Sequence, residues 1–344
     1  MAKTVKVGII GLGRLGKAHA QNLAFNVPNC ELYAACSMVE EELDYAKREL
    51  GVEKVYTDYD EMVKDEAIDA VFIVSPSGLH CEQIQKAMEQ GKHVFSEKPI
   101  GLDIPEINQT IEVINAHPEQ LFMLGFMRRY DESYQYAKEM VDRGDLGELT
   151  VVRCYGIDPS DGLESFVKFA GASNSGGLFA DMSIHDIDLL RWFTNKEAKK
   201  VWAIGKNAAY PELDAVGELE TGAAMVQMED KTMGILVAGR NSQHGYHVET
   251  ELIGTKGMLR IAQVPEKNLV TLMNEHGIVR PTSQNFPERF AQAFINETKE
   301  FIQCILEGRQ PGVGAIDGLE STRVAIACQR SYETDELVSL KEIN

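Results

Sequence analysis

The 344-residue sequence predicts a two-domain α/β protein, with a doubly wound parallel sheet first and a second α/β domain after it. Strand-like and helix-like runs alternate over residues 1–125, which is typical of parallel strands covered by helices. Beyond that point the alternation stops, and β-rich runs separated only by turns fill residues 200–280, which indicates an antiparallel or mixed sheet. The chain is also longer than one hydrophobic core usually serves. We therefore expect domains at 1–125 and 126–344, with the last helices packing back on the first domain.

The first domain opens with a strand at residues 5–10, a glycine-rich turn at 11–16 and a helix from 17 to about 25. A second apolar run, residues 32–36, follows the turn closely enough to complete a strand-helix-strand unit. The pattern then repeats, with strands expected at 70–74, 93–95 and 121–124 and helices at 79–90 and 104–116.

The second domain begins with a helix near residues 131–143 and a strand at 149–155, followed by a polar loop with Gly and Ser at 158–177. Its β-rich part contains expected strands at residues 222–228, 233–239, 247–253 and 258–263. Two amphipathic helices, near 287–307 and 315–334, close the chain, and a break that contains Gly and Pro separates them.

Composition and charge argue against several classes of partner. The formal net charge of −19 disfavours nucleic acid and anionic membrane surfaces. No apolar run approaches the ~20 residues of a membrane span, and the first residues lead into a strand rather than a signal peptide, so we expect a cytoplasmic protein. The six cysteines are scattered, without a Cys-x-x-Cys pair or clustered histidines, which predicts reduced thiols and no metal site.

The turn Gly11-Leu12-Gly13-Arg14-Leu15-Gly16 lies between a strand and a helix, which is the context of a Rossmann dinucleotide site. Gly11 permits the tight turn, Gly13 lets a pyrophosphate approach the backbone, and Gly16 lets the helix pack close to the strand. Amide groups at the start of the helix favour an anion. We therefore expect Gly11, Gly13, Arg14 and Leu15 to contact the cofactor.

The residue that ends the second strand bears on the choice of cofactor. Ser37 stands where an Asp or Glu would bind the adenosine ribose of NAD. A serine could accept the 2′-phosphate of NADP, but no arginine follows it, and the acidic run Glu40-Glu41-Glu42 would repel that phosphate. We therefore expect NAD, with NADP left open.

Two further segments follow strands at the carboxyl edge of the sheet, where ligands bind in open α/β folds. Ser75, Pro76 and His80 are expected to contact the nicotinamide or its ribose, although a turn capped by Ser77 explains them equally well. Lys98 follows the next strand, and its ammonium could hydrogen-bond a substrate hydroxyl and stabilise a developing alkoxide. The alternative is an ordinary solubilising lysine.

Residues 176–191 place three titratable side chains at helical spacing in an apolar segment. Asp181 and His185 are four residues apart, so the carboxylate could orient the imidazole and raise its basicity, as in a supported general base. The alternative is a core histidine satisfied by a neighbouring acid. Asp188 and Arg191 are expected to form an ion pair or helix-surface contacts rather than to act in catalysis.

Four motifs occur in one order: Gly11-x-Gly13-x-x-Gly16, Glu97-Lys98-Pro99, Gly125-Phe126-Met127-Arg128-Arg129-Tyr130 and Gly176-Gly177-x-x-x-Asp181-x-x-x-His185-Asp186-x-Asp188-x-x-Arg191. Each motif alone is modest, whereas the ordered set is highly specific. The set resembles the glucose–fructose oxidoreductase/inositol dehydrogenase/rhizopine catabolism (Gfo/Idh/MocA) family over nearly the whole chain. Within that family the chain looks most like the inositol 2-dehydrogenases.

This resemblance assigns roles to particular residues. Lys98 matches the lysine of the Glu-Lys-Pro motif, Asp181 the supporting acid and His185 the catalytic base. Arg128 matches a substrate-contacting arginine, and Tyr246 a substrate-side tyrosine. These five residues form the expected substrate site.

The resemblance also bears on the backbone, the cofactor and the assembly. Glu97 and Lys98 count among the cofactor contacts, and a cis peptide is implied before Pro99. The implied second domain is built on a large, open, mostly antiparallel sheet that mediates oligomers, for which we expect a homotetramer.

The implied reaction is NAD-dependent oxidation of a ring hydroxyl of myo- or scyllo-inositol to the corresponding inosose. Gly245-Tyr246-His247 departs from the Tyr-Asp that often follows this glycine, and the loop 158–175 is unusual in length, so the stereochemistry of the polyol stays open. The alternatives are a dehydrogenase of another sugar or polyol, such as an aldose, a deoxy-sugar or a rhizopine-like compound, and a non-catalytic dinucleotide and sugar sensor.

Overall fold

A computed structural model describes residues 4–170, 176–262, 266–275 and 277–344. Contacts divide the chain into two compact units. The first contains the chain up to Tyr130 together with Gln292–Leu319, and the second contains Asp131–Ala291 and Glu320–Asn344. The division therefore falls near the expected boundary at 125/126, and a segment from the C-terminal part of the chain belongs to the first unit.

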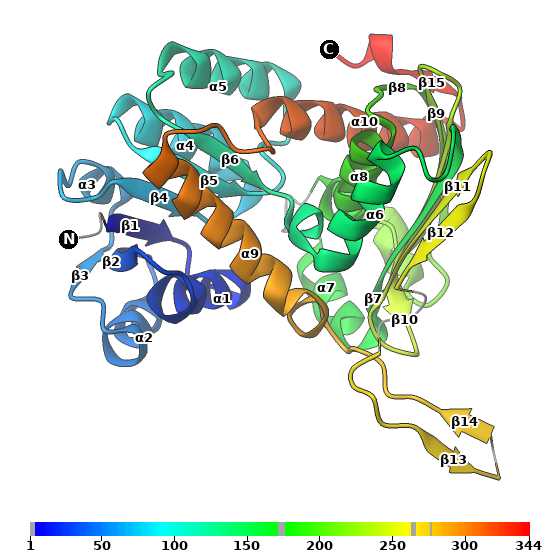
Figure 1. Cartoon of the computed structure of the whole chain (residues 1–344), viewed down its shortest axis with the longest axis horizontal. Helices are drawn as coiled ribbons and strands as arrows, with labels where there is room; N and C mark the ends of the chain where they lie inside the picture. Colours follow the sequence, from blue (N-terminus) through cyan, green and yellow to red (C-terminus); the bar gives the residue numbers. More distant parts are fainter. Residues whose placement is uncertain (1–3, 171–175, 263–265, 276) are drawn as a thin grey trace. The chain divides into compact units, whose positions relative to one another are not determined.

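The first unit is built on a six-stranded parallel sheet with the order β3-β2-β1-β4-β5-β6. The strands are β1 (Val5–Ile10), β2 (Cys30–Cys36), β3 (Lys54–Tyr56), β4 (Ala70–Ile73), β5 (His93–Glu97) and β6 (Phe122–Gly125). The strand order reverses between β1 and β4, which is the switch point of a doubly wound sheet. The predicted Rossmann architecture is confirmed (Figure 1).

The helices of the first unit mostly follow the predicted alternation. They are α1 (Arg14–Gln21), which continues into the π-helical η1 (Asn22–Asn26), α2 (Glu40–Leu50), α3 (Tyr59–Val63), η2 (Ser77–Leu79), α4 (His80–Glu89), α5 (Ile104–Ala116) and η3 (Met127–Tyr130). No element was predicted between residues 37 and 69, where α2, β3 and α3 lie. These three elements are short or largely polar, so their apolar pattern is weak.

Aromatic side chains from both ends of the chain form part of the first core. Phe72 and Phe95 are register partners on β4 and β5, and their rings stack with centroids 4.4 Å apart. Phe301, from helix α9 (Phe286–Glu307), meets both rings edge-on. All three side chains are fully buried. The predicted C-terminal helix thus supplies core packing to the N-terminal sheet, because its residues from Gln292 belong to the first unit.

The second unit is built on a seven-stranded mixed sheet with the order β12-β11-β7-β10-β9-β8-β15. The strands are β7 (Leu149–Pro159), β8 (Ala198–Lys206), β9 (Thr221–Met228), β10 (Met233–Ser242), β11 (His247–Gly254), β12 (Met258–Ile261) and β15 (Val338–Ser339). Among these described strands only β7 and β10 pair in parallel, so the expectation of a mostly antiparallel sheet is confirmed.

Helices cover one face of this second sheet. Figure 1 shows α6 (Glu132–Asp142) and α8 (Ile184–Thr194) on the same side of the strands. A Cβ built on Gly234 of β10 would overlap the Leu190 side chain, so glycine lets α8 approach the sheet closely. The π-helical η5 (Phe179–Ser183) leads directly into α8.

The remaining elements are α7 (Leu163–Ala170), α10 (Ala315–Thr334), the short η4 (Ser160–Gly162), η6 (Pro211–Val216) and η7 (Leu340–Glu342), and a hairpin of β13 (Leu272–Asn274) and β14 (Gly277–Val279). The helix α10 has the predicted bounds. No helix of the described ranges combines the length and apolar composition that a membrane span requires.

The prediction of a polar loop over 158–177 is wrong for most of that segment. Strand β7 continues to Pro159, and η4 and α7 follow it. Leu163, Phe166, Val167 and Ala170 recur at helical spacing, and this amphipathic pattern outweighs the Ser and Gly residues on either side. Residues 171–175 of the predicted loop lie outside the described part of the chain.

The second sheet yields a stability prediction. Leu236 lies at the centre of β10 and is 1% exposed, so Leu236→Ala should lower the free energy of unfolding by about 2–5 kcal/mol through lost burial and a residual cavity. Urea unfolding followed by circular dichroism measures the change. The control Gln135→Ala, at an exposed position of helix α6 in the same unit, should shift stability by no more than about 0.5 kcal/mol. Equal effects of the two variants would contradict the assigned core.

Candidate active site

The glycine-rich turn has the geometry that its sequence predicts. Gly11 has φ of +86°, and a Cβ there would overlap the Val74 carbonyl at the end of β4. A Cβ on Gly16 would overlap the Gly11 carbonyl oxygen. Both positions therefore require glycine, because the turn, α1 and the end of β4 are in close contact.

Gly13 differs from these two glycines. It caps the start of α1, and nothing lies within 4 Å of a Cβ built on it. The space beside its backbone is open, and the amide groups of the first turn of α1 have no helical partners. Arg14 is exposed and Leu15 half-buried at the same helix start. The turn thus fits a pyrophosphate, which needs close approach to backbone N–H groups at a helix N-terminus.

A carboxylate lies beside the end of β2, although Ser37, the residue that follows this strand, is not acidic. The Ser37 hydroxyl donates a 2.6 Å hydrogen bond to Glu42 Oε2, and the Val39 N–H donates to the Ser37 oxygen at 3.0 Å. Glu42, in the first turn of α2, therefore places a negative charge next to Ser37, where NAD sites usually have an Asp or Glu. Such a group can accept hydrogen bonds from ribose hydroxyls and repels a 2′-phosphate.

His80 connects the two segments that follow β4 and β5. Its Nδ1 lies 2.7 Å from the Pro99 carbonyl oxygen, and its Nε2 lies 2.9 Å from that of Ser75. Burial lowers the pKa of His80. Both ring nitrogens face backbone, so His80 holds Ser75 and the exposed Pro76 in position rather than offering a ring nitrogen to a ligand.

The Glu-Lys-Pro segment lies at the carboxyl end of β5. Its Lys98–Pro99 peptide bond is cis, as the resemblance implied. Glu97 is buried, with Oε1 2.8 Å from His19 Nε2 and Oε2 accepting from the Lys98 N–H at 3.1 Å. The Glu97 side chain is thus engaged within the protein, whereas Lys98 is half-buried at the edge where ligands bind.

The two arginines that follow β6 have different contacts. Arg128 and Arg129 both lie in η3 and are buried. Arg129 forms a 2.9 Å ion pair with Asp317 and donates to the Gly312 carbonyl, so it stabilises the first unit. The resemblance assigns the substrate contact to Arg128, and these contacts give Arg129 a separate structural role.

In the second unit, Asp181 and His185 are separated by a change of helix type. Asp181 lies in the π-helical η5, whereas His185 is in the first turn of α8. Both side chains are partly exposed. The prediction of one regular α-helical turn between them is therefore wrong, because the wider π turn intervenes. Single π turns inside helices are frequent at functional sites.

Arg240 is the functional candidate that sequence reasoning missed. It lies on β10, is 6% exposed, and donates through Nη1 to Asp181 Oδ2 at 2.9 Å. Its guanidinium also stacks 3.9 Å from the centre of the Phe166 ring of α7. A signal existed in the sequence, since Arg240 follows Leu236 and Ala238 at inward positions of an alternating strand, where a charge needs a partner.

The structure also shows the surroundings of three other residues of the second unit that the sequence analysis named, Tyr246, Arg191 and Asp188. Tyr246 is buried between β10 and β11, where its N–H donates to the Ser283 carbonyl oxygen and its ring meets Phe290 edge-on. Arg191 makes a two-pronged ion pair with Glu197, both contacts at 2.7 Å, which supports a structural role. Asp188 is buried in the same helix.

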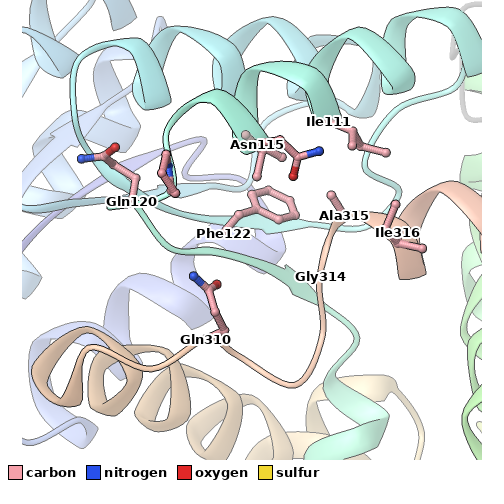
Figure 2. A pocket seen from close by; sticks show the side chains of 10 residues that line it. Ile111, Asn115, Gln120, Phe122, Gln310, Gly314, Ala315 and Ile316 are labelled. Carbon is pink, nitrogen blue, oxygen red and sulfur yellow. The ribbon is translucent and has the colours of Figure 1, made fainter.

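A separate cavity of about 300 Å³ opens in the first unit, lined by α5, the start of β6 and the segment before α10 (Figure 2). Ile111, Asn115, Phe122 and Gln310 are among its lining residues. Phe122 is the first residue of β6, so the cavity lies toward the amino end of that strand. Ligands of open α/β sheets bind at the opposite edge, and no predicted site residue lines this cavity.

Comparisons with known proteins match both parts of the chain to one family. Residues 5–126 match the oxidoreductase family GFO_IDH_MocA, described by its NAD-binding Rossmann fold, and residues 134–260 match the C-terminal domain of the same family. A myo-inositol 2-dehydrogenase of Thermotoga maritima is 31% identical over 98% of this chain and 99% of its own length.

Two solved structures are more similar. The crystal structure of scyllo-inositol dehydrogenase from Lactobacillus casei with bound NAD(H) and scyllo-inositol is 63% identical, covers 98% of this chain and 100% of its own, and has a TM-score of 0.96. That of myo-inositol 2-dehydrogenase from Lactobacillus plantarum is 46% identical over 98% of this chain and 99% of its own, also with a TM-score of 0.96.

The contact between Ser37 and Glu42 yields a prediction about the cofactor. Glu42→Gln removes the negative charge, so NAD should bind about tenfold more weakly and the preference for NAD over NADP should narrow. Fluorescence titration with both cofactors measures this. Glu41→Gln, an exposed neighbour on the same helix, should leave both affinities unchanged. Tighter binding of NADP than of NAD by the unmodified protein would refute the assignment.

Proposed function

Because the chain belongs to the Gfo/Idh/MocA oxidoreductase family, we propose that it oxidises a secondary ring hydroxyl of an inositol to the ketone, with NAD as the hydride acceptor. The observation that carries this proposal is the 63% identity, over nearly both full lengths, to the L. casei enzyme crystallised with NAD(H) and scyllo-inositol. Function within a family follows site chemistry, and the residues assigned to cofactor and proton transfer are all present here.

The proposed substrate is scyllo-inositol, with myo-inositol as the second candidate. Identity is 62–63% to scyllo-inositol dehydrogenase of L. casei and 46% to myo-inositol 2-dehydrogenase of L. plantarum. The two epimers differ only in whether one hydroxyl lies axial or equatorial, so a small change in side-chain placement decides between them.

The proposed NAD site uses the carboxyl edge of the first sheet. Gly11, Gly13, Arg14 and Leu15 border the pyrophosphate, since Gly13 leaves open space at the helix start. Ser37 and Glu42 take the adenosine ribose. Ser75, Pro76, Glu97 and Lys98 border the nicotinamide half, and His80 holds that edge through backbone contacts. NAD, when bound, supplies the carbon that accepts the hydride, C4 of the nicotinamide.

In the proposed reaction His185 takes the proton of the substrate hydroxyl while hydride leaves the carbon that bears this hydroxyl. The ketone forms as the C–H bond breaks, so one proton and one hydride balance the oxidation. Lys98 donates a hydrogen bond to the reacting oxygen and stabilises its partial negative charge. Arg128 and Tyr246 are proposed to bind other hydroxyls of the ring.

We add Arg240 to this scheme as a proposed positioning residue. Asp181 is the proposed support of His185, and the Arg240 guanidinium lies 2.9 Å from the Asp181 carboxylate. A charge-assisted bond from a buried arginine holds that carboxylate in one orientation. Arg240 therefore acts through Asp181 as a positioning residue and does not itself transfer a proton.

We also propose that the chain forms a homotetramer through the uncovered face of the second sheet. Trp202, Ile204, Met225, Met233 and Met258 stand on that sheet with exposed fractions from 38% to 54%. Met225 is the register partner of both Trp202 and Ile235, so these side chains are neighbours across three strands. Exposed apolar groups on adjoining strands are typical of a protein contact surface.

A turnover assay tests the proposed reaction. The unmodified protein should form NADH, followed at 340 nm, with NAD and scyllo-inositol. His185→Ala should lower kcat by roughly 10²–10⁴-fold with the fold intact, because it removes the base. The matched control His117→Ala changes a histidine on the loop after α5 and should leave kcat unchanged.

The assay is repeated with myo-inositol, chiro-inositols and glucose, and with NADP. Turnover of myo-inositol but not of scyllo-inositol would show that the proposed substrate is the wrong epimer. Silence with every polyol while NAD still binds would remove the inositol dehydrogenase proposal and favour another sugar substrate or a sensor.

Light scattering tests the assembly. Met225→Asp places a charge in the apolar face and should convert the tetramer into a smaller species. Met38→Asp, the same substitution at a residue of the first unit that is 92% exposed, should leave the tetramer intact. An unmodified protein that is monomeric at micromolar concentration would overturn the tetramer.

A further inference from the structure

Three titratable side chains meet inside the first unit, although they are far apart in the sequence. His19 is on α1, Glu97 ends β5 and Glu297 is on α9. Their potential ligating atoms all lie within 4.8 Å of one another. His19 and Glu297 are fully buried, and Glu97 is 5% exposed. Neither the sequence motifs nor the proposed reaction assigns a role to His19 or Glu297.

The contacts of this cluster converge on the backbone of Lys98. His19 Nε2 lies 2.8 Å from Glu97 Oε1, and an ionised carboxylate at this place accepts a hydrogen bond from the imidazole N–H. The other oxygen of Glu97 accepts from the Lys98 N–H at 3.1 Å. One carboxylate therefore connects helix α1, which begins at the open Gly13, to the residue that carries the proposed catalytic ammonium.

The surroundings of the cluster are apolar. The rings of Phe72, Phe95 and Phe294 lie with centroids 5.4–6.0 Å from that of His19. Neither oxygen of Glu297 has a hydrogen-bond partner among the described residues. An ionised carboxylate in such a place is expensive, and the neighbouring charge of Glu97 adds repulsion. These two causes, burial first, raise the pKa of Glu297 well above its ordinary value near 4.5.

Among the described residues, no cation lowers the pKa of Glu297. Tyr130 of η3 lies close enough for Glu297 to help raise its pKa, and burial is the larger cause of that shift. Arg129, on the same turn, is paired with Asp317. Burial without a compensating cation therefore favours the protonated form of Glu297.

We propose that His19 and a neutral Glu297 are positioning residues that act through Glu97 to hold the Lys98 backbone in place for hydride transfer. This inference rests on the proposed catalytic role of Lys98. His19 keeps Glu97 oriented, and uncharged Glu297 fills the space beside it without a second negative charge that would push Glu97 from the Lys98 amide. Displacement of a reacting group by about 1 Å can cost about 100-fold in rate, so this support affects kcat.

The state of Glu297 is tested by the pH dependence of thermal unfolding. A carboxyl whose pKa is raised by folding is ionised only in the unfolded chain, so it lowers stability as pH rises above about 4.5. Glu297→Gln and Glu297→Met remove this ionisation. Between pH 5 and pH 8 the Tm of either variant should fall less steeply than that of the unmodified protein. Parallel slopes would overturn the neutral state of Glu297.

The role of His19 is tested by kinetics. His19→Leu cannot donate to Glu97, and kcat should fall by ~10–100-fold while the Kd of NAD, measured by fluorescence, stays within about threefold. His19→Gln can still donate and should recover part of the lost kcat. A purely structural role would instead lower Tm and leave the kcat of the folded enzyme unchanged. That result would overturn the inference.

Lys98→Ala separates this inference from the proposed function. Retained activity of Lys98→Ala would remove Lys98 from catalysis and with it the basis of the proposal. Loss of activity in Lys98→Ala together with normal kcat in His19→Leu and Glu97→Gln would overturn the positioning role alone. Metal analysis of the purified enzyme is a further check, since a stoichiometric divalent ion bound by the cluster would mean that Glu297 is ionised. We expect no such ion.

Discussion

The segments that follow β1, β4 and β5 must be held in place at one edge of the sheet. Much of the proposed chemistry depends on that constraint. Two buried imidazoles maintain it. His80 lies against the carbonyl oxygens of Ser75 and Pro99, which follow β4 and β5, and His19 joins α1 to Glu97. Parallel strands bring their ends together, but the peptide segments beyond them have no ladder partners. Side chains that bridge those segments therefore determine where a cofactor and Lys98 can lie.

The second unit uses a related arrangement around a different carboxylate. Arg240 projects from β10 toward the helix-covered face of the sheet, where it contacts Asp181 and the ring of Phe166. In each unit a buried side chain contacts a carboxylate: Glu97, which accepts from the Lys98 N–H, and Asp181, which precedes His185 by four residues in the sequence. Buried charges are retained only with partners, so each such contact fixes geometry more than it adds stability. The π turn at Asp181 is a further local departure from regular structure at the same place.

Local patterns predicted most of the regular elements. Strand β1, helix α5 and helix α10 have the expected bounds, because their apolar residues recur with a clear period and turn residues border them. The failures also have local causes. The sequence pattern predicts a loop where α7 lies because Ser and Gly flank that helix, and it predicts no helix at α2 because α2 buries only Leu43, Ala46 and Leu50. The role of Ser37 was unclear because the nearby acid, Glu42, lies on the next element.

The sequence by itself determined the doubly wound first domain, the glycine-rich turn, the family resemblance and the identity of Lys98, Asp181 and His185 as candidates, since all of these depend on short-range spacing. Tertiary structure alone decided that Arg240 contacts Asp181 and that His19 and Glu297 meet at Glu97. The alternating pattern of a strand can show that a buried charge needs a partner, but it does not show which distant residue that partner is. The partner becomes recognisable only when strand order and helix packing bring the two residues within a few ångströms.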